Sequence, residues 1–505
     1  MHAHATAHRR RRQVLRHRTT AARPGKLPLP MSERPVFRNR RVRLEPEERG
    51  QVTPYAGLAL AYKLCQGLDL PRTIDRDLTL LKLHLPYHES DHVLSHTFNI
   101  FAGGDCIEDG AMLQNSGAFQ NLVGSPRIPD PTTAGDFLRR FSARDLGVLE
   151  QVIDEVRSRV WRLLPRAKRR RATVDLDSSL KPVYGECKQG AAFSYKKTWS
   201  YHPLLISVAE TNECLRLRNR PGNAGSAEGI EEALDPCLGR LVEQFDQVVV
   251  RGDSAFYRRE LMKTCLAHGA DFALVMKTSP ALERAVQALP ERAFRPFDSR
   301  RDPTVCPRPG KACRRRRQRI RRLKARRRGY RTLSTVAEWV AETRYRPRGF
   351  NRDFRVVVKR QLVREENQGE LFERYVYRCI ITTLEDMRAT DLLKYAYGRC
   401  NQENTIEQLK NGVSALRMPT GELVANGAFM MAALLAWNLR AWLSLLVLPA
   451  ESLGWEWKRF RHAFVYAAGK IVRAARVAVV RLAASHRFTP QMIEASRRLD
   501  ALVFR

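Results

Sequence analysis

The sequence predicts an α/β protein in which a mixed β-sheet with flanking helices lies between two helical regions. Strand-length apolar runs alternate with helical patterns in the middle of the chain, between residues 172 and 276. Apolar residues also recur at helical spacing before and after this segment. With 505 residues, of which 44% are hydrophobic, the chain is long enough for roughly two to four structural units with sizeable cores.

The N-terminal third is predicted to be a basic tail followed by helices. Residues 1–48 are rich in Arg, His and Pro and lack apolar periodicity, so we expect them to be disordered. Residues 49–168 carry helical patterns, of which the clearest runs from Leu146 to Leu164. We interpret this region as a helical bundle. Its charged faces are either simply solvated or contact DNA, and the pattern alone leaves both open.

The predicted sheet begins after residue 171. The strand-length runs are Ala172–Leu176, Pro203–Val208, Cys214–Leu217, Val248–Val250 and Phe272–Met276. Helical patterns at Ser226–Phe245 and Arg258–His268 separate the third run from the fourth and the fourth from the fifth. Closely joined strands can be antiparallel, whereas strands connected through a helix are parallel. We therefore expect a mixed sheet, built from residues 169–278 and 377–415.

An insertion is predicted after the fifth strand. Residues 279–376 contain an Arg-rich run and then strand-like pieces at Leu333–Val340 and Phe354–Val358, so we expect an insertion with its own small β part. Tyr377–Thr383 is one more apolar strand. The C-terminal region, residues 416–505, is again interpreted as helical.

Several classes of protein are disfavoured by the sequence. The apolar stretch Gly427–Leu448 has the length of a membrane span, but it contains Asn438 and Arg440, which are costly at a bilayer centre, so we expect a buried helix. The ten cysteines are scattered without a Cys-x-x-Cys pair, which favours reduced thiols in a cytosolic compartment. Neither a P-loop nor a dinucleotide fingerprint is present, so we expect no nucleotide cofactor.

The net charge of +36 is concentrated in two stretches. Residues 1–43 hold thirteen Lys and Arg against one acidic residue, and residues 311–331 hold thirteen and no acidic residue. Dense positive charge predicts a polyphosphate partner, with nucleic acid as the first candidate and an anionic membrane as the second. Phosphate contact is the predicted use of the second stretch, which includes Arg314, Arg315, Arg316 and Arg317.

Three separated acidic residues form the candidate catalytic site. Asp177 and Asp253 stand where the first and fourth apolar runs stop, and Glu403 lies on a helical pattern. In one pocket they could hold two divalent ions, which can activate a hydroxyl and stabilise the leaving oxygen of a phosphodiester. Asp175 shares the strand face of Asp177 and is the alternative first ligand. For any single aspartate after a strand, a turn-forming role is the simpler interpretation.

Two basic residues accompany Glu403. Arg399 lies four residues before it and Lys410 seven after, so the three would fall along one face of a helix. They could grip phosphates beside a metal site, or they could belong to a salt-bridged helix surface.

Other basic residues are candidate DNA contacts. Lys196 and Lys197 lie among aromatic residues near the second strand. They could bind a DNA backbone, or they could be surface residues of a β-hairpin. Arg220 precedes a glycine-containing loop that leads into a helix, where backbone amides could meet a phosphate. His202 could act as a base, although a metal-based hydrolysis requires none.

Together these motifs resemble the DDE transposases of bacterial insertion sequences, specifically the cut-and-paste branch with the motif Tyr-x2-Arg-x3-Glu-x6-Lys. Arg399, Glu403 and Lys410 match this motif in spacing, while Ala396 stands at the tyrosine position between two tyrosines. The other segments that look like this family are Asp175–Ser179, Tyr184–Gly185, Gly190–Ala191, Tyr195–Lys197, Tyr201–Leu204, Arg220–Asn223 and Arg251–Ser254.

The resemblance covers roughly residues 50 to 445 and carries several implications. It implies a ribonuclease H-like catalytic domain with a β insertion, and a catalytic triad of Asp177, Asp253 and Glu403 that binds two Mg²⁺ ions, with Mn²⁺ as an alternative. It also implies binding to terminal inverted repeats and target DNA, with a homodimer as the active complex. A metal-dependent nuclease of the same fold and a catalytically inactive DNA-binding relative remain as alternative interpretations.

Overall fold

The computed structural model describes residues 51–277, 279–297, 332–367, 370–398, 400–474 and 477–504. At a few of these, among them residues 400–403, only the backbone is described. The predicted basic tail, the Arg-rich run with Arg314, Arg315, Arg316 and Arg317, and Arg399 therefore lie outside the described residues.

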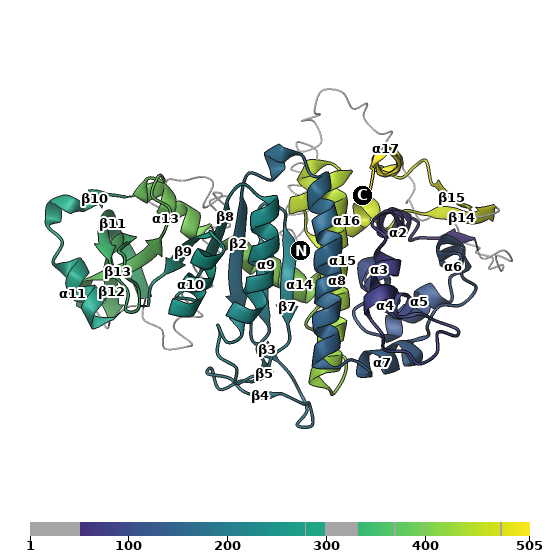
Figure 1. Cartoon of the computed structure of the whole chain (residues 1–505), viewed down its shortest axis with the longest axis horizontal. Coiled ribbons are helices and arrows are strands. Elements are labelled where there is room, and N and C mark those ends of the chain that lie inside the picture. The colour runs from purple at the N-terminus through teal and green to yellow at the C-terminus, as the bar shows by residue number, and fades with distance from the viewer. Residues whose placement is uncertain are drawn as a thin grey trace, which may run out of the picture. The chain divides into compact units, whose positions relative to one another are not determined.

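A nine-stranded mixed sheet forms the centre of the described structure (Figure 1). In spatial order its strands are β10 (Arg295–Pro296), β11 (Thr332–Tyr345), β12 (Phe354–Asn367), β13 (Glu370–Thr382), β9 (Asp271–Val275), β8 (Val248–Gly252), β2 (Ala172–Ser178), β6 (Leu204–Val208) and β7 (Glu213–Arg218). Strands β2, β8 and β9 are parallel, and the remaining pairs are antiparallel. The fold class predicted from the sequence, an α/β protein with a mixed sheet and flanking helices, is confirmed.

Helices cover both faces of the sheet because both faces of its central strands are apolar. Helices α9 (Ile230–Gln244) and α10 (Arg259–Ala267) follow β7 and β8 and make the crossovers that parallel strands require. Val248 and Val250 of β8 join the core that includes α9, whereas Val249 between them joins a second core with α13 (Ala389–Tyr397). This alternation along β8 places α9 and α13 on opposite faces of the sheet.

The strands of the insertion extend the central sheet. After α11 (Pro280–Gln287), the long strands β11, β12 and β13 pair in sequence, and Ile380–Thr382 of β13 then pair with β9. The predicted strand at Tyr377–Thr383 is the end of β13, so the insertion grows out of a core strand. One continuous hydrogen-bonded sheet is the result.

The N-terminal part of the described chain is helical, as expected. Its helices are α2 (Leu58–Gly67), α3 (Leu70–Asp77), α4 (Glu89–Ala102), α5 (Ala111–Gln114), α6 (Gly117–Val123), α7 (Pro131–Arg139) and α8 (Ala143–Leu163). Ser142 begins α8 with a capping box, in which its hydroxyl accepts from the Asp145 amide and the Asp145 side chain accepts from the Ser142 amide.

The C-terminal part packs against the N-terminal helices and includes a hairpin that we had not expected. Its helices are α14 (Cys400–Asn411), α15 (Leu423–Leu446), α16 (Trp457–Phe464) and α17 (Thr489–Ala501). Strands β14 (Gly469–Ala474) and β15 (Val477–Leu482) form the hairpin, and β14 pairs with β1 (Val52–Thr53). Figure 1 accordingly shows the end of the described chain beside its beginning.

Helix α15 is buried against the edge of the sheet. Among the described residues it alone is long and apolar enough to cross a membrane by length and composition, yet 94% of its apolar window is buried. Asn438, which is completely buried, accepts from the Cys214 amide and donates to the Cys214 carbonyl, both at 2.9 Å. These bonds satisfy the outer edge of β7, as buried backbone groups require. The expected buried helix is therefore present.

A buried acidic residue ties α8, β7 and α15 together. Glu213 of β7 has no exposed surface, and its two carboxylate oxygens accept from the indole nitrogens of Trp161 and Trp442, each at 2.7 Å. Arg157 lies 3.6 Å from the same carboxylate. Because a buried carboxylate needs such partners, this arrangement fixes the two long helices against the sheet edge.

Candidate active site

Asp177 and Asp253 lie side by side at the carboxyl ends of two neighbouring parallel strands. The register pairs Asp175 of β2 with Arg251 of β8, and two further residues along each strand bring Asp177 opposite Asp253. Neighbouring strands are about 5 Å apart, so the two aspartates share one crevice. Both are partly exposed, and both belong to the face of the sheet that α13 covers.

Asp175 is engaged in a buried ion pair one step below this crevice. Its two carboxylate oxygens accept from Nε and Nη2 of Arg251, both at 2.7 Å, and both side chains are buried. Burial alone would lower the pKa of Arg251, but the bonded Asp175 carboxylate outweighs it, and the pKa is raised. The pair fixes the register of β2 on β8 immediately beneath Asp177 and Asp253.

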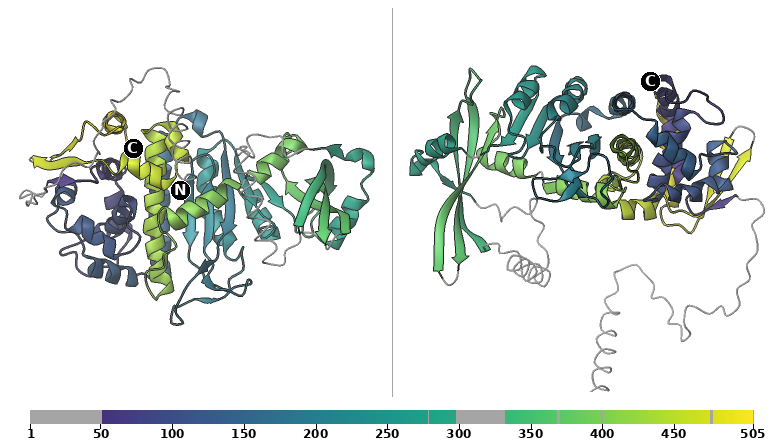
Figure 2. Two further views of the ribbon diagram at one scale, coloured as in Figure 1. Left: turned by 180° about the vertical axis from the view of Figure 1, so that it is seen from behind. Right: turned by 90° about the horizontal axis from the view of Figure 1, so that it is seen from below.

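The chain is tied to this edge of the sheet both before and after Glu403, which lies on helix α14. Before it, in α13, Nη1 of Arg251 donates to the Tyr395 carbonyl oxygen at 2.5 Å. After it, the Lys410 ammonium donates to the Ser179 hydroxyl at 2.5 Å, just beyond the end of β2. Seen from behind, in the left panel of Figure 2, the helix runs across the central strands. The backbone of Glu403 therefore lies between two contacts to the acidic crevice, while its side chain is outside the described set.

A basic cluster, defined as Lys181, Lys188, Lys410 and Arg417, borders Asp177. Burial first, and then the charge of Lys181, lowers the pKa of Lys410, while the charge of Asp177 acts in the opposite direction. Burial, and then the charges of Arg417 and Lys188, likewise lowers the pKa of Lys181. Cations that repel one another in a half-buried site are stabilised by an anion, so the cluster is suited to bind a phosphate.

The tyrosine next to the expected motif position is built into the site. The Tyr395 hydroxyl shares a hydrogen bond of 2.8 Å with the Thr173 hydroxyl on β2, and its ring lies 4.7 Å from the Arg251 guanidinium. Burial raises the pKa of Tyr395 to about 12. Ala396, at the motif position itself, is a buried core residue. A tyrosine therefore braces the Asp175–Arg251 pair from the neighbouring position.

His202 is a buried neutral residue that holds the end of β2. Its Nδ1 donates to the Ala224 carbonyl at 2.8 Å, which leaves Nε2 to accept from the Ser178 hydroxyl at 3.0 Å. Burial lowers the pKa of the imidazole. The Ser178 amide in turn donates to Oδ1 of Asp177 at 2.8 Å. His202 is thus a positioning residue for Asp177.

The remaining predicted DNA contacts divide into exposed and buried residues. Lys196 and Lys197 are exposed at the tip of a small sheet formed by β3 (Lys181–Pro182), β5 (Trp199–Tyr201) and β4 (Ala192–Phe193). The Tyr195 ring beside them is 69% exposed and lies 5.4 Å from the Lys196 ammonium. Arg220, by contrast, is buried and donates to the carbonyl oxygens of three residues, His202, Ser226 and Glu228.

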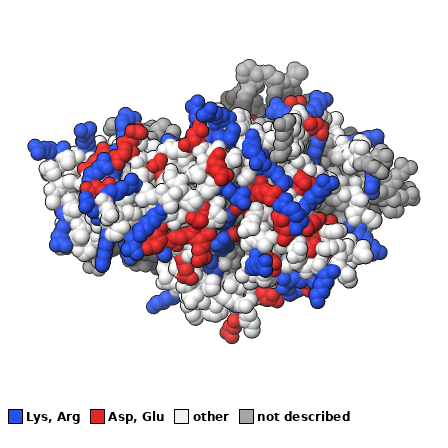
Figure 3. Space-filling model, viewed as in Figure 1, with Lys and Arg blue, Asp and Glu red and all other residues white. Residues whose placement is uncertain are grey.

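Sequence reasoning missed three members of the basic cluster, namely Lys181, Lys188 and Arg417. Lys181 and Lys188 lie more than two hundred residues before Lys410 and Arg417, so only the fold brings the two pairs together. Figure 3 shows Lys and Arg interspersed with Asp and Glu on the face seen in Figure 1.

The chemistry of the site is compatible with hard divalent ions. Asp177 and Asp253 offer carboxylate oxygens at a partly exposed edge, and Lys410, whose charge acts on Asp177, is bonded to Ser179. Mg²⁺ and Mn²⁺ prefer such oxygen ligands and keep positions for water and phosphate. Glu403 would add the third carboxylate from α14.

The chain matches a known protein family over most of its length. The model described as transposase DDE domain group 1 matches residues 34–503. The chain belongs to this family of DDE transposases. The resemblance inferred from the separate motifs is therefore confirmed. Membership of this transposase family implies DNA as the partner and divalent metal ions in the chemistry.

Comparison with other proteins adds a structural likeness at low identity. No curated protein matches the chain. Among solved structures, a piggyBac transposase synaptic complex with hairpin DNA, determined by cryo-EM, matches with 11% sequence identity and a TM-score of 0.35. The match covers 81% of this chain and 80% of the piggyBac chain.

Proposed function

We propose that this DDE transposase cleaves phosphodiester bonds at the terminal inverted repeats of its element and joins the freed 3′ ends to target DNA. Asp177, Asp253 and Glu403 are the proposed catalytic residues. The observation that carries the proposal is the position of Asp177 and Asp253 at the ends of neighbouring parallel strands, with α13 tied to this edge before Glu403 and α14 tied to it after Glu403.

The three carboxylates are the proposed ligands of two Mg²⁺ ions, for which Mn²⁺ could substitute. Bound ions of this kind supply an activated hydroxyl and neutralise the charge that develops on the leaving oxygen. Hydrolysis at each end and the later joining are both in-line displacements at phosphorus, so one site can serve both steps. The Asp175–Arg251 pair supports Asp177 as the first ligand, because both Asp175 oxygens are already bonded.

The basic residues are proposed to hold DNA around the acidic crevice. Lys410 already reaches Ser179 at the end of β2, and with the other members of the basic cluster it would hold the scissile or a flanking phosphate. Lys196 and Lys197, exposed beside an aromatic ring, are proposed contacts to the DNA backbone and an unstacked base. Further proposed DNA contacts are Arg399, Arg314, Arg315, Arg316 and Arg317.

Arg220 has a different proposed part. Its three carbonyl contacts hold the loop that precedes α9, so it would shape this loop, and a direct phosphate contact would use the N–H groups that these bonds leave. Residues 49–168 are the proposed end-binding region, and a homodimer is the proposed active complex, because two ends must be held together.

The proposal is tested by cleavage of a DNA duplex that carries the element's end. We expect Asp253→Asn to abolish Mg²⁺-dependent cleavage and to leave end binding in a gel-shift assay within a fewfold of the unsubstituted protein. Asp246→Asn is the matched control, because Asp246 is exposed and lies just before the opposite end of β8. Full cleavage by the Asp253→Asn protein would end the proposal.

The same assay separates the two alternative functions. A nuclease of the same fold would cleave the duplex but would fail to join pre-cleaved ends to a target plasmid. A catalytically inactive DNA-binding relative would bind the ends without nicking them in Mg²⁺ or Mn²⁺. We expect both cleavage and joining.

A further inference from the structure

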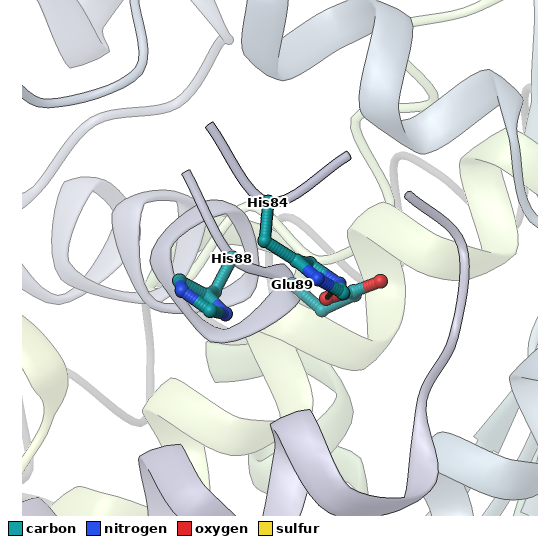
Figure 4. Close-up of side chains that lie close together, drawn as sticks. All are labelled: His84, His88 and Glu89. Atoms are coloured by element: carbon teal, nitrogen blue, oxygen red, sulfur yellow. Dashed lines mark ion pairs between the residues drawn. The ribbon is translucent and has the colours of Figure 1, made fainter. Parts of the chain in front are cut away.

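A second group of potential metal ligands lies in the N-terminal helices, in and just after the segment that joins α3 to α4. His84, His88 and Glu89 each place one ligand atom within 4.8 Å of the others (Figure 4). His84 belongs to the connecting segment, His88 immediately precedes α4, and Glu89 is the first residue of that helix. None of the three takes part in the acidic crevice at the end of β2 and β8.

Glu89 brings a buried carboxylate oxygen to this group. Its side chain is 1% exposed, and Oε1 accepts from the amides of Leu80 and Leu81, each at 2.9 Å. Oε2 is buried and accepts no hydrogen bond, while Nε2 of His84 lies 3.1 Å from it. The group therefore contains a buried carboxylate oxygen that is turned toward an imidazole.

The two histidines stand on the solvent side of that carboxylate. Their rings are stacked with centroids 4.9 Å apart and planes within 2° of parallel. The His84 side chain is 48% exposed and His88 is exposed, so either ring can rotate without disturbing the core. Figure 4 shows the His84 ring over the Glu89 carboxylate and the His88 ring beside it.

We propose that His84, His88 and Glu89 form a binding site for a transition-metal ion, with Zn²⁺ as the best match. Two imidazoles and one carboxylate are a ligand set that Zn²⁺ takes in proteins, with water in the fourth position. Tetrahedral ligands about 2.0–2.1 Å from Zn²⁺ are about 3.3 Å apart. The separation of 3.1 Å between Nε2 of His84 and Oε2 of Glu89 is close to this value, and the exposed His88 ring would turn toward them to complete the set.

The ion would act as a clip for the segment between the two helices. Glu89 is anchored through Leu80 and Leu81 at one end of this segment, and His84 and His88 lie farther along it. A shared ion would join these points, and its binding energy would add to the stability of the folded state. Its chemistry differs from that of the acidic crevice, which offers carboxylates alone and suits Mg²⁺.

The test is Zn²⁺ titration of the metal-free protein by calorimetry in buffer with excess Mg²⁺, which occupies carboxylate sites and competes poorly for imidazole. We expect one equivalent of Zn²⁺ to bind and to raise the melting temperature. His84→Ala and His88→Ala should each weaken Zn²⁺ binding by more than about a hundredfold, because loss of a direct ligand exceeds the ten- to hundredfold effect typical of supporting residues.

The matched control is His268→Ala. His268 also pairs with a carboxylate, since its Nε2 lies 2.9 Å from Asp235, but it belongs to no three-ligand group among the described residues. This protein should bind Zn²⁺ like the unsubstituted one. Because His84 and His88 are exposed, their variants should fold, which circular dichroism checks. Absence of the tight Zn²⁺ equivalent, or its persistence in either histidine variant, would overturn the proposal without bearing on DNA cleavage.

Discussion

The same change, aspartate to asparagine, should have opposite consequences at two positions of β2. Asp175 faces Arg251 in a buried ion pair, whereas Asp177, two residues later, is partly exposed in the crevice with Asp253. We expect Asp175→Asn to reduce stability and to spare the chemistry. Asp177→Asn should abolish DNA cleavage and leave stability nearly unchanged.

The magnitude follows from the partners of Arg251. Removing one member of a buried ion pair costs about 3–5 kcal/mol. Arg251 would keep its hydrogen bond to the Tyr395 carbonyl and its contact with the Tyr395 ring, so the lower value, about 3 kcal/mol, applies. At Asp177 the asparagine oxygen can still accept the Ser178 amide, so a change within about 0.5 kcal/mol is expected.

Urea unfolding and end cleavage, measured on both variants, test this reasoning. Saturating Mg²⁺ should stabilise the unsubstituted protein and Asp175→Asn but not Asp177→Asn, because only the folded site binds the ion. Replacing Asp175 and Arg251 together by apolar residues of similar size should recover most of the lost stability. If Asp175→Asn kept full stability and lost cleavage, Asp175 would be the first metal ligand and the assignment of Asp177 would fail.

Three further predictions concern other parts of the molecule. Lys410→Met should weaken end binding at every sequence and reduce the slope of log affinity against log salt by about one, because one phosphate contact is lost; fluorescence anisotropy at several salt concentrations measures it. Burial lowers the pKa of His96 to about 4 in the folded protein, whereas its unfolded pKa is about 6.5. Below pH 6.5 the unfolded state therefore binds a proton that the folded state does not, so stability is complete above pH 6.5 and is lost as the pH falls toward 4. The free energy of unfolding should fall by about 3 kcal/mol over this range, and His96→Gln, which keeps a donor for the Ala134 carbonyl, should flatten the dependence. Asn438→Leu should cost about 1–3 kcal/mol in urea unfolding because it leaves the buried Cys214 amide without an acceptor, while the Cys214 carbonyl keeps Arg157; an unchanged midpoint would contradict the role given to Asn438.

Local sequence patterns predicted the central strands because each is a short apolar run that ends at polar residues. They also predicted that α15 is buried, since Asn438 and Arg440 do not suit a bilayer, and the structure pairs Asn438 with the edge of β7. The placement of Asp177 and Asp253 at strand ends followed in the same way. Their alignment could not be predicted, because it depends on the register of β2 on β8.

Pairings between distant segments were not predictable from local patterns. The insertion was expected to have a β part, and nothing local specifies that its strand β13 pairs with β9, about a hundred residues away in sequence. The hairpin at Gly469–Leu482 falls within the C-terminal region that was interpreted as helical, and its alanine and arginine residues do favour helices. Pairing with β1 and packing on α6 override this preference. The basic cluster escaped notice for the same reason, because Lys181 meets Lys410 only in the folded chain.

The central claim is that Asp177 and Asp253 hold the same divalent ions, and ligand exchange tests it most directly. Thiolate is a poor ligand for Mg²⁺ and a better one for softer ions. DNA-end cleavage by Asp177→Cys and by Asp253→Cys should therefore be absent in Mg²⁺ and return in Mn²⁺ or Zn²⁺, while binding of the ends stays intact. Cleavage by both cysteine variants in Mg²⁺ at the rate of the unsubstituted protein would contradict the account.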